Sequence, residues 1–304
     1  MSCVVFPGQG SQYVGMSRDF WDNYDIAKKT LKEIEDYTKI DLKKIIFDDS
    51  DGKLNITKYT QISIFAASMM IFKTVKENSN ILNSSINVMM GHSLGEYTSL
   101  ACADKLSLKD CSLILKKRGE LMHNAVEPNK SGMAALIGKD AKQIEDIIQT
   151  NNLDLEIAND NSPMQVVISG NIEEIMKNKD LFLKKNVKKY IVLNVSAAFH
   201  SKFMSDAEKD LSSEIEKLDF RTNGINIISN YTSEISNNNS IIKNSLKKQM
   251  SNRVRWVESI KKLEEIGEKT IIEIGPNKVL SGLINRISKN FDIKSINEIT
   301  ELDL

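Results

Sequence analysis

A serine between two glycines, in the first third of the chain, constrains the fold most strongly. Residues 87–97 read Asn-Val-Met-Met-Gly-His-Ser-Leu-Gly-Glu-Tyr, an apolar run that enters Gly-x-Ser-x-Gly and continues into a helical pattern. Glycines at 91 and 95 permit the sharp strand-to-helix turn that presents a serine hydroxyl above a sheet. A turn rich in Gly and Ser also arises by chance, so an ordinary loop is the alternative. The flanking strand and helix patterns favour a nucleophile elbow with Ser93 at its tip.

The composition fits one large domain, or one domain that carries an insertion. The chain has 304 residues, 41% of them hydrophobic, which is enough for a substantial core. Its 41 basic and 41 acidic residues cancel, which argues against a nucleic-acid binder driven by bulk charge. Three cysteines without metal-ligand spacing predict free thiols in a reducing compartment and no metal site. Because neither a secretory leader nor a membrane-length apolar run occurs, we expect a cytoplasmic protein without membrane contact.

A second glycine-rich loop follows the first apolar strand, residues 2–6. Residues 7–12 read Pro-Gly-Gln-Gly-Ser-Gln, which is too rich in glycine to continue a strand. Such a loop is either a plain connection to a helix or a set of backbone N–H groups that faces an anion. It lacks the lysine of a phosphate-binding P-loop. The periodicity predicts helices around residues 26–37, from 57 to 77, and from Ser107 onward.

The pattern changes between residues 129 and 196, where strands and helices alternate in the order βαββαβ. This is the ferredoxin-like arrangement, and Glu127–Gly132 resembles a linker that leads into it. We therefore expect a core of residues 1–128 and 197–304, interrupted by an inserted subdomain of residues 129–196. The insert is expected to contain strands at 132–137, 155–159, 165–169 and 188–193, and helices at 141–150 and 172–185.

Outside the insert, the strands alternate with helices on both sides of the elbow. Further strands are expected at 226–229 and 269–274. This alternation is typical of a mainly parallel sheet and assigns the protein to the α/β class. The Asn/Ser stretch at 236–240 predicts a surface loop.

Serine needs a base within hydrogen-bond reach to act as a nucleophile, and the chain has three histidines. His92 adjoins Ser93, and neighbouring side chains on so tight a turn point apart. His123 lies near a predicted helix end. His200 follows the insert, where the chain returns to the elbow domain, and is therefore the best candidate for the base. A capping or surface role for His200 is the alternative that the sequence leaves open.

Several segments together resemble the malonyl-CoA:acyl carrier protein transacylases of fatty acid synthesis, and the resemblance spans nearly the whole chain. It implies an α/β hydrolase-like core interrupted by a ferredoxin-like insert, in agreement with the pattern above. The matching segments are 8–12 (Gly-Gln-Gly-Ser-Gln), 91–97 (Gly-His-Ser-Leu-Gly-Glu-Tyr), 118–122 (Arg-Gly-Glu-Leu-Met), 158–170, 198–201 (Ala-Phe-His-Ser) and 273–276 (Glu-Ile-Gly-Pro).

The resemblance also implies residue roles. Ser93 would be the nucleophile, His200 the base, and Arg118 the partner of the malonyl carboxylate, although a single helical arginine is more often solvated. The remaining members of the implied site are the backbone N–H groups of Gln12 and Leu94 as the oxyanion hole, and Gln249, His92 and Phe199 in the substrate-binding set.

The loop that bears His200 departs from the family pattern. Relatives usually have a proline before the Phe-His pair and often another before Val-Ser, whereas this chain has Ala198 and Asn194. The family also holds its histidine with a backbone carbonyl instead of a carboxylate, and Gln249 best matches that position. We therefore expect the histidine to keep its role on a less rigid loop.

The implied activity is transfer of a malonyl group from malonyl-CoA to acyl carrier protein through a malonyl-serine, without a cofactor. We expect a monomer, because no apolar stripe calls for a second copy. A serine esterase with the same elbow is one alternative, but esterases place a late histidine after an acidic residue. A non-catalytic assembly protein is the other alternative, and the joint presence of Ser93, His200 and Arg118 weighs against it.

Overall fold

The first strand, β1 (Ser2–Phe6), occupies the middle of the larger of two sheets in this computed structural model, which describes residues 2–83, 86–127 and 129–302. All five residues of β1 are buried, as expected of an apolar strand covered on both faces. The strand order is β10-β9-β1-β2-β7-β8, and within the described part of this sheet only the β7–β8 pair is antiparallel. The other members are β2 (Ile86–Gly91), β7 (Asn226–Ile228), β8 (Ile235–Ser236), β9 (Thr270–Ile274) and β10 (Asp292–Ile296).

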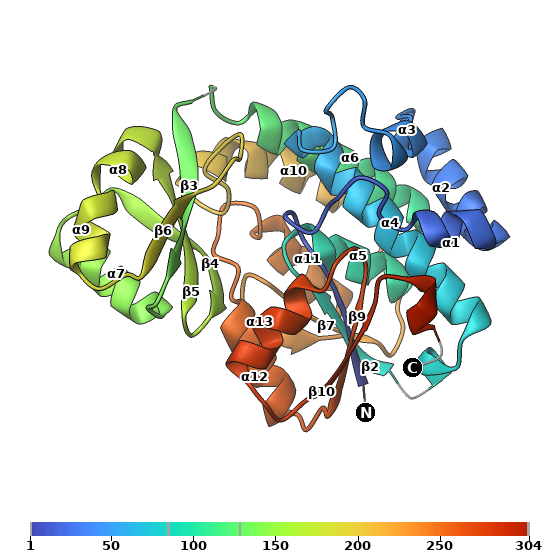
Figure 1. The fold of residues 1–304 in the computed structure, drawn as a ribbon. Helices are drawn as coiled ribbons and strands as arrows, with labels where there is room; N and C mark the ends of the chain where they lie inside the picture. Colours follow the sequence, from blue (N-terminus) through green and yellow to red (C-terminus); the bar gives the residue numbers. More distant parts are fainter. Residues whose placement is uncertain (1, 84–85, 128, 303–304) are drawn as a thin grey trace.

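Side chains of β1 alternate between two hydrophobic clusters, one on each face of the sheet. Val4 and Phe6 join the cluster that contains the long helix α4, whereas Cys3 and Val5 join the one that contains α12 and α13. Figure 1 shows the same layering, with α4, α5 and α6 on one side of the large sheet and α12 and α13 on the other. The helices of this body are α1 (Arg18–Asn23), α2 (Asp25–Thr38), α3 (Leu42–Phe47), α4 (Thr57–Asn78), α5 (Leu94–Cys102), α6 (Leu108–Asn124), α10 (Ser205–Glu216), α11 (Asn239–Lys247), α12 (Trp256–Glu265) and α13 (Val279–Ile287), with short 3₁₀ turns η1 (Ile81–Asn83), η2 (Lys202–Met204) and η3 (Ile299–Glu301).

The second sheet forms a smaller body to one side (Figure 1). Its order is β4-β5-β3-β6, with every pair antiparallel, and its helices cover one face, which confirms the ferredoxin-like prediction. The chain order is β3 (Ser131–Ile137), α7 (Ala141–Thr150), β4 (Leu155–Ser162), β5 (Gln165–Asn171), α8 (Ile172–Lys177), α9 (Lys179–Lys184) and β6 (Lys189–Val192).

Two predicted elements differ from the structure. The helix expected at 172–185 is broken at Asn178, whose side chain donates to the carbonyl of Glu174 and so competes with the helical pattern. The loop expected at 236–240 instead contains the start of α11, because the Asn238 side chain caps its first N–H groups. The division into residues 1–128 with 197–304, and 129–196, stays a prediction, and Pro128 of the expected linker lies outside the described residues.

One extended segment joins the two bodies. Val254 forms a parallel bridge with Asn159 of β4. Its N–H donates to the carbonyl of Ala158 (2.8 Å), and its carbonyl accepts from the N–H of Asp160 (3.0 Å). Next to it, the N–H of Arg255 donates to the carbonyl of Asn230, just after β7 (3.0 Å). The chain from 249 to 255 is therefore attached to both sheets.

Candidate active site

Ser93 lies on a strained turn between β2 and α5. Its φ of 54° and ψ of −108° are unusual for a residue with a side chain. A Cβ on Gly91 would lie 2.1 Å from the backbone carbon of Gly95, and one on Gly95 would lie 2.2 Å from the carbonyl oxygen of Phe6. The two glycines are thus required by close backbone approach, as the elbow motif predicts.

His200 meets Ser93 from a loop 107 residues further along the chain. Its Nε2 lies 2.8 Å from Ser93 Oγ. Its Nδ1 lies 3.0 Å from the carbonyl oxygen of Gln249 and 3.1 Å from that of Asn252. Because carbonyls only accept hydrogen bonds, Nδ1 must carry the proton of a neutral ring. Nε2 is then an acceptor aimed at the serine hydroxyl, the arrangement that general-base catalysis requires.

The protonation state of His200 is set by its surroundings. Burial and the nearby positive charge of Arg118 lower its pKa from 6.5 to about 3, against a smaller raising effect of the two carbonyls. The unliganded ring is therefore neutral at neutral pH and free to accept a proton.

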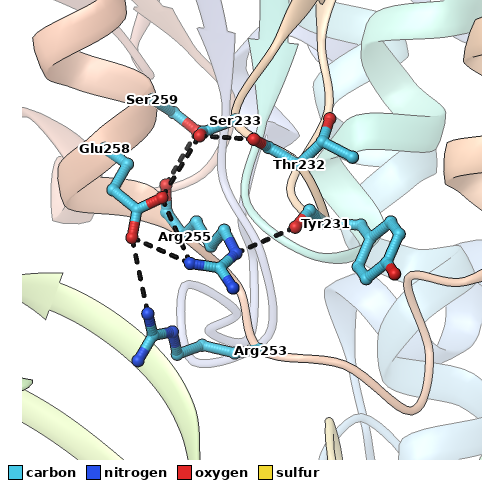
Figure 2. A network of polar contacts seen from close by, with 7 residues as sticks. All are labelled: Tyr231, Thr232, Ser233, Arg253, Arg255, Glu258 and Ser259. Carbon is cyan, nitrogen blue, oxygen red and sulfur yellow. Dashed lines mark hydrogen bonds and ion pairs between the residues drawn. The ribbon is translucent and has the colours of Figure 1, made fainter.

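The loop that supplies the two carbonyls is itself anchored by a polar network (Figure 2). Arg255 donates from Nε to the carbonyl of Tyr231 (3.0 Å) and from Nη1 to Glu258 (2.9 Å), and Glu258 also accepts from Arg253 (3.4 Å). Together with the Val254 bridge, these contacts fix the backbone that orients His200.

Arg118 is buried, with 1% of its surface exposed, although a single helical arginine is more often solvated. Its Nη1 donates to Gln61 Oε1 (2.6 Å), and its Nη2 donates to Ser93 Oγ (3.0 Å) and to Gln249 Oε1 (2.9 Å). Its Nε is buried without an acceptor among the described residues. A buried guanidinium beside the nucleophile, with no carboxylate of the described residues bonded to it, is suited to bind an anionic ligand.

The side chain of Gln249 connects the arginine to the elbow. While Oε1 accepts from Arg118, Nε2 donates to the carbonyl of Ser93 and to Glu96 Oε2, both at 2.8 Å. Glu96 also accepts from the N–H of Asn230 (3.1 Å), and Asn230 Oδ1 accepts from the N–H of Ser93 (2.6 Å). Burial raises the pKa of Glu96 to about 7, against the lowering effect of these hydrogen bonds.

A cavity of about 100 Å³ opens beside these groups. His92 and Phe199 are among the residues that line it, and Nε2 of His92 is hydrogen-bonded to Asn161 Oδ1 (2.8 Å). His123 does not reach this cavity. The full lining comprises Gln9, Gln61, His92, Ser93, Leu94, Arg118, Met122, Met133, Asn159, Leu193, Val195, Phe199 and His200. The described part of the chain contains no cluster of three His, Cys, Asp or Glu that could hold a metal.

The structure separates the two residues expected to supply oxyanion N–H groups. Leu94 lines the cavity and is the first residue of α5, so its N–H has no intrahelical acceptor. Gln12 is not among the described lining residues, and its side chain accepts from the N–H of Gly10 and donates to Asn55. Gln9 of the same loop lines the cavity instead.

The site predicted from the sequence did not include five polar members: Gln9, Gln61, Glu96, Asn159 and Asn230. Gln61 and Glu96 carried a usable signal, because a polar side chain within an otherwise apolar helix has to find a buried partner. Asn230 carried none, since an asparagine after a strand usually marks a turn.

Residues 3–301 match the family described as acyl transferase domain. The chain is 35% identical to the malonyl CoA-acyl carrier protein transacylase of Staphylococcus aureus strain MSSA476, over 99% of this chain and 97% of that protein. It is 32% identical to the solved acyl-carrier-protein-S-malonyltransferase of Bartonella henselae, with a TM-score of 0.94 over 99% and 96% of the two chains. A malonyl-transacylase solved in complex with its holo type II PKS acyl-carrier protein is 30% identical, with a TM-score of 0.93 over 99% and 97%.

Proposed function

Because the chain belongs to the acyl transferase family, and within it to the malonyl CoA-acyl carrier protein transacylases, we propose that it transfers malonyl from malonyl-CoA to the phosphopantetheine thiol of acyl carrier protein. One observation carries the chemistry: the Ser93 hydroxyl is hydrogen-bonded to both His200 and Arg118. The first is a base for the nucleophile, and the second is a receptor for the carboxylate that distinguishes malonyl from neutral acyl groups.

The transfer proceeds in two balanced steps. Ser93 Oγ attacks the thioester carbonyl while His200 takes its proton; the new C–O bond forms, the C–S bond breaks, and the proton passes to the departing thiolate of CoA. The thiol of the carrier protein then gives its proton to His200 and attacks the malonyl-serine. The C–S bond forms, the C–O bond to Ser93 breaks, and the proton passes from His200 to Ser93 Oγ, which regenerates the free hydroxyl.

The oxyanion of each tetrahedral intermediate needs two N–H donors. We assign one to Leu94, whose N–H begins α5. For the second, the cavity lining favours Gln9 over Gln12, the residue that the resemblance implies.

A serine esterase with the same elbow is the weaker alternative. Its histidine is normally oriented by a carboxylate, whereas His200 Nδ1 faces two backbone carbonyls. An esterase also has no use for a buried guanidinium that contacts its nucleophile.

The proposal extends to the setting of the enzyme. We place it in the cytoplasm, in fatty acid synthesis, as a monomer that docks acyl carrier protein and uses no cofactor. No helix in the described ranges is long and apolar enough to cross a bilayer.

Intact-protein mass spectrometry after mixing with malonyl-CoA tests the proposal. The wild type should gain one malonyl group and lose it when holo acyl carrier protein is added. Ser93→Ala should gain none, and His200→Ala should acquire the group about 10²- to 10⁴-fold more slowly. Ser213→Ala, at an exposed position on α10, should behave as wild type.

Two other results would contradict the proposal. Release of free malonate without carrier protein at the rate of loading would indicate a hydrolase. An unchanged mass would indicate a protein without acyltransferase activity.

A further inference from the structure

We propose that Arg118 restrains Ser93 in the unliganded enzyme and that the carboxylate of the substrate releases it, so that malonyl activates its own transfer. This inference rests on the proposed function and adds a second role for Arg118. Besides attracting the carboxylate, Arg118 would keep the serine unreactive toward acyl groups that have none.

The hydrogen bonds of the Arg118 guanidinium are concentrated on Nη2. A guanidinium offers two parallel N–H pairs to a carboxylate, Nε with Nη2 and Nη1 with Nη2, so each pair needs a hydrogen of Nη2. Both hydrogens of Nη2 are engaged, one by Ser93 Oγ (3.0 Å) and one by Gln249 Oε1 (2.9 Å). A bidentate carboxylate must therefore displace one of these two acceptors.

Ser93 is the acceptor that a carboxylate can displace. The amide of Gln249 is held from its other end, because Nε2 donates to both the carbonyl of Ser93 and Glu96. Turning this amide away would break those two bonds and leave buried polar groups unpaired. The Ser93 hydroxyl keeps its bond to His200 when Arg118 leaves it.

While the bond from Arg118 persists, it opposes acylation in two ways. It occupies a lone pair of the oxygen that must attack the thioester. Arg118 also carries a positive charge beside His200, and His200 itself becomes positive when it takes the serine proton. The charge of Arg118 is one reason for the low pKa of the His200 ring.

A carboxylate on Arg118 removes both obstacles, because it takes over the Nη2 hydrogen and neutralises the charge. Malonyl brings that carboxylate with it, whereas acetyl does not. The enzyme then discriminates in the rate of the acylation step as well as in binding.

To test whether the carboxylate releases Ser93, the acyl group and the carboxylate of malonyl can be supplied by two separate molecules. Single-turnover acetylation of Ser93 by acetyl-CoA is carried out in sodium formate or in sodium chloride at the same ionic strength. The rate is measured by quenching and intact-protein mass spectrometry. Formate should accelerate wild-type acetylation by about tenfold at saturation, the rate equivalent of one charge-assisted hydrogen bond. Pivalate, a carboxylate too bulky for a cavity of about 100 Å³ that also holds the acetyl group, should have no effect.

Variants identify the responding residue. Arg118→Met should acetylate at least as fast as wild type in chloride and should not respond to formate. Arg221→Met, which removes an exposed arginine paired with Asp104, should keep the full response. The wild-type comparison stands even if Arg118→Met fails to fold.

An unchanged or slower wild-type acetylation in formate would overturn the inference, and slowing would show that Arg118 assists Ser93 directly. An equal response in Arg118→Met would place the formate site elsewhere. Malonyl loading of the same wild-type sample, measured without formate, reports separately on the proposed function.

Discussion

The two ends of the Ser93–His200 hydrogen bond are held in different ways. The serine is positioned locally, by a turn whose Gly91 and Gly95 leave no room for a Cβ. The histidine is positioned from far along the chain, by carbonyls of Gln249 and Asn252 on a segment attached to both sheets. The nucleophile therefore depends first on steric constraint around its own turn, with added bonds to its main chain from Asn230 and Gln249. The base depends for its orientation on the path of a distant loop.

This difference decides what a substitution can do. A change in the elbow acts on folding, because backbone atoms cannot move apart without disrupting β1 and β2. A change around the histidine acts first on alignment and therefore on rate.

Gly95→Ala should have the largest effect. Its Cβ would lie 2.2 Å from the carbonyl oxygen of Phe6, so β1 and α5 must separate, at a cost of about 3 kcal/mol or more. Urea unfolding monitored by circular dichroism measures the change. Gly282→Ala is the matched control: a Cβ there meets nothing within 4 Å, and in α13 it should stabilise by about 0.5–1 kcal/mol. A near-neutral Gly95→Ala would show that the elbow is not held by steric constraint.

The pH dependence of stability should have opposite signs for His200 and for Glu96, a residue of the elbow helix α5. The folded pKa of His200 is about 3, below its ordinary value of 6.5, so the unfolded chain takes up the proton first. Its contribution to stability is present above pH 6.5 and is lost as the pH falls toward 3. The folded pKa of Glu96 is about 7, above its ordinary 4.5, so its contribution is present below 4.5 and is lost as the pH rises through 7.

Denaturant titrations at pH 4 to 8 separate the two contributions. The stability difference between wild type and His200→Gln should fall toward acid, and that between wild type and Glu96→Gln should fall toward alkali. Parallel curves for wild type and a variant would show that its residue does not titrate as described.

Arg255→Met should have the smallest effect. It removes the bonds to Tyr231 and Glu258 that anchor the carbonyl-bearing loop, but the Val254 bridge remains. The expected loss of stability is under about 1 kcal/mol, as for other partly exposed ion pairs. Malonylation should slow severalfold, measured by quenched single-turnover loading. Arg221→Met should lose similar stability without slowing, and equal rates in both variants would exclude a role for the anchor.

The sequence predicted the features that repeat or that constrain the backbone locally. The parallel sheet and the ferredoxin-like insert follow from the alternation of apolar segments, and the comparisons confirm that fold class. The elbow at Ser93 follows from glycines at fixed spacing. The structure brings His200 and Arg118 to Ser93, as the resemblance implied.

Other features could not be predicted from the sequence, for physical reasons. The strand β10 is too polar to show an apolar pattern, because it lies at the edge of its sheet. The choice between Gln9 and Gln12 depends on the path of one loop, and both residues have the same side chain. The network of Glu96, Asn230 and Gln249 joins residues more than 130 positions apart, which no local pattern records.

The use of main-chain oxygens to orient His200 bears on how this enzyme tolerates sequence drift. A carboxylate in that position could be deleted by one codon change, whereas every residue at 249 or 252 brings the same carbonyl group. Substitutions at 252 therefore leave the orientation of the base intact for as long as the loop keeps its path, and inherited variation there is filtered by backbone shape. Position 249 supplies its carbonyl in the same way, but its side chain is constrained separately by the bonds to Arg118 and Glu96.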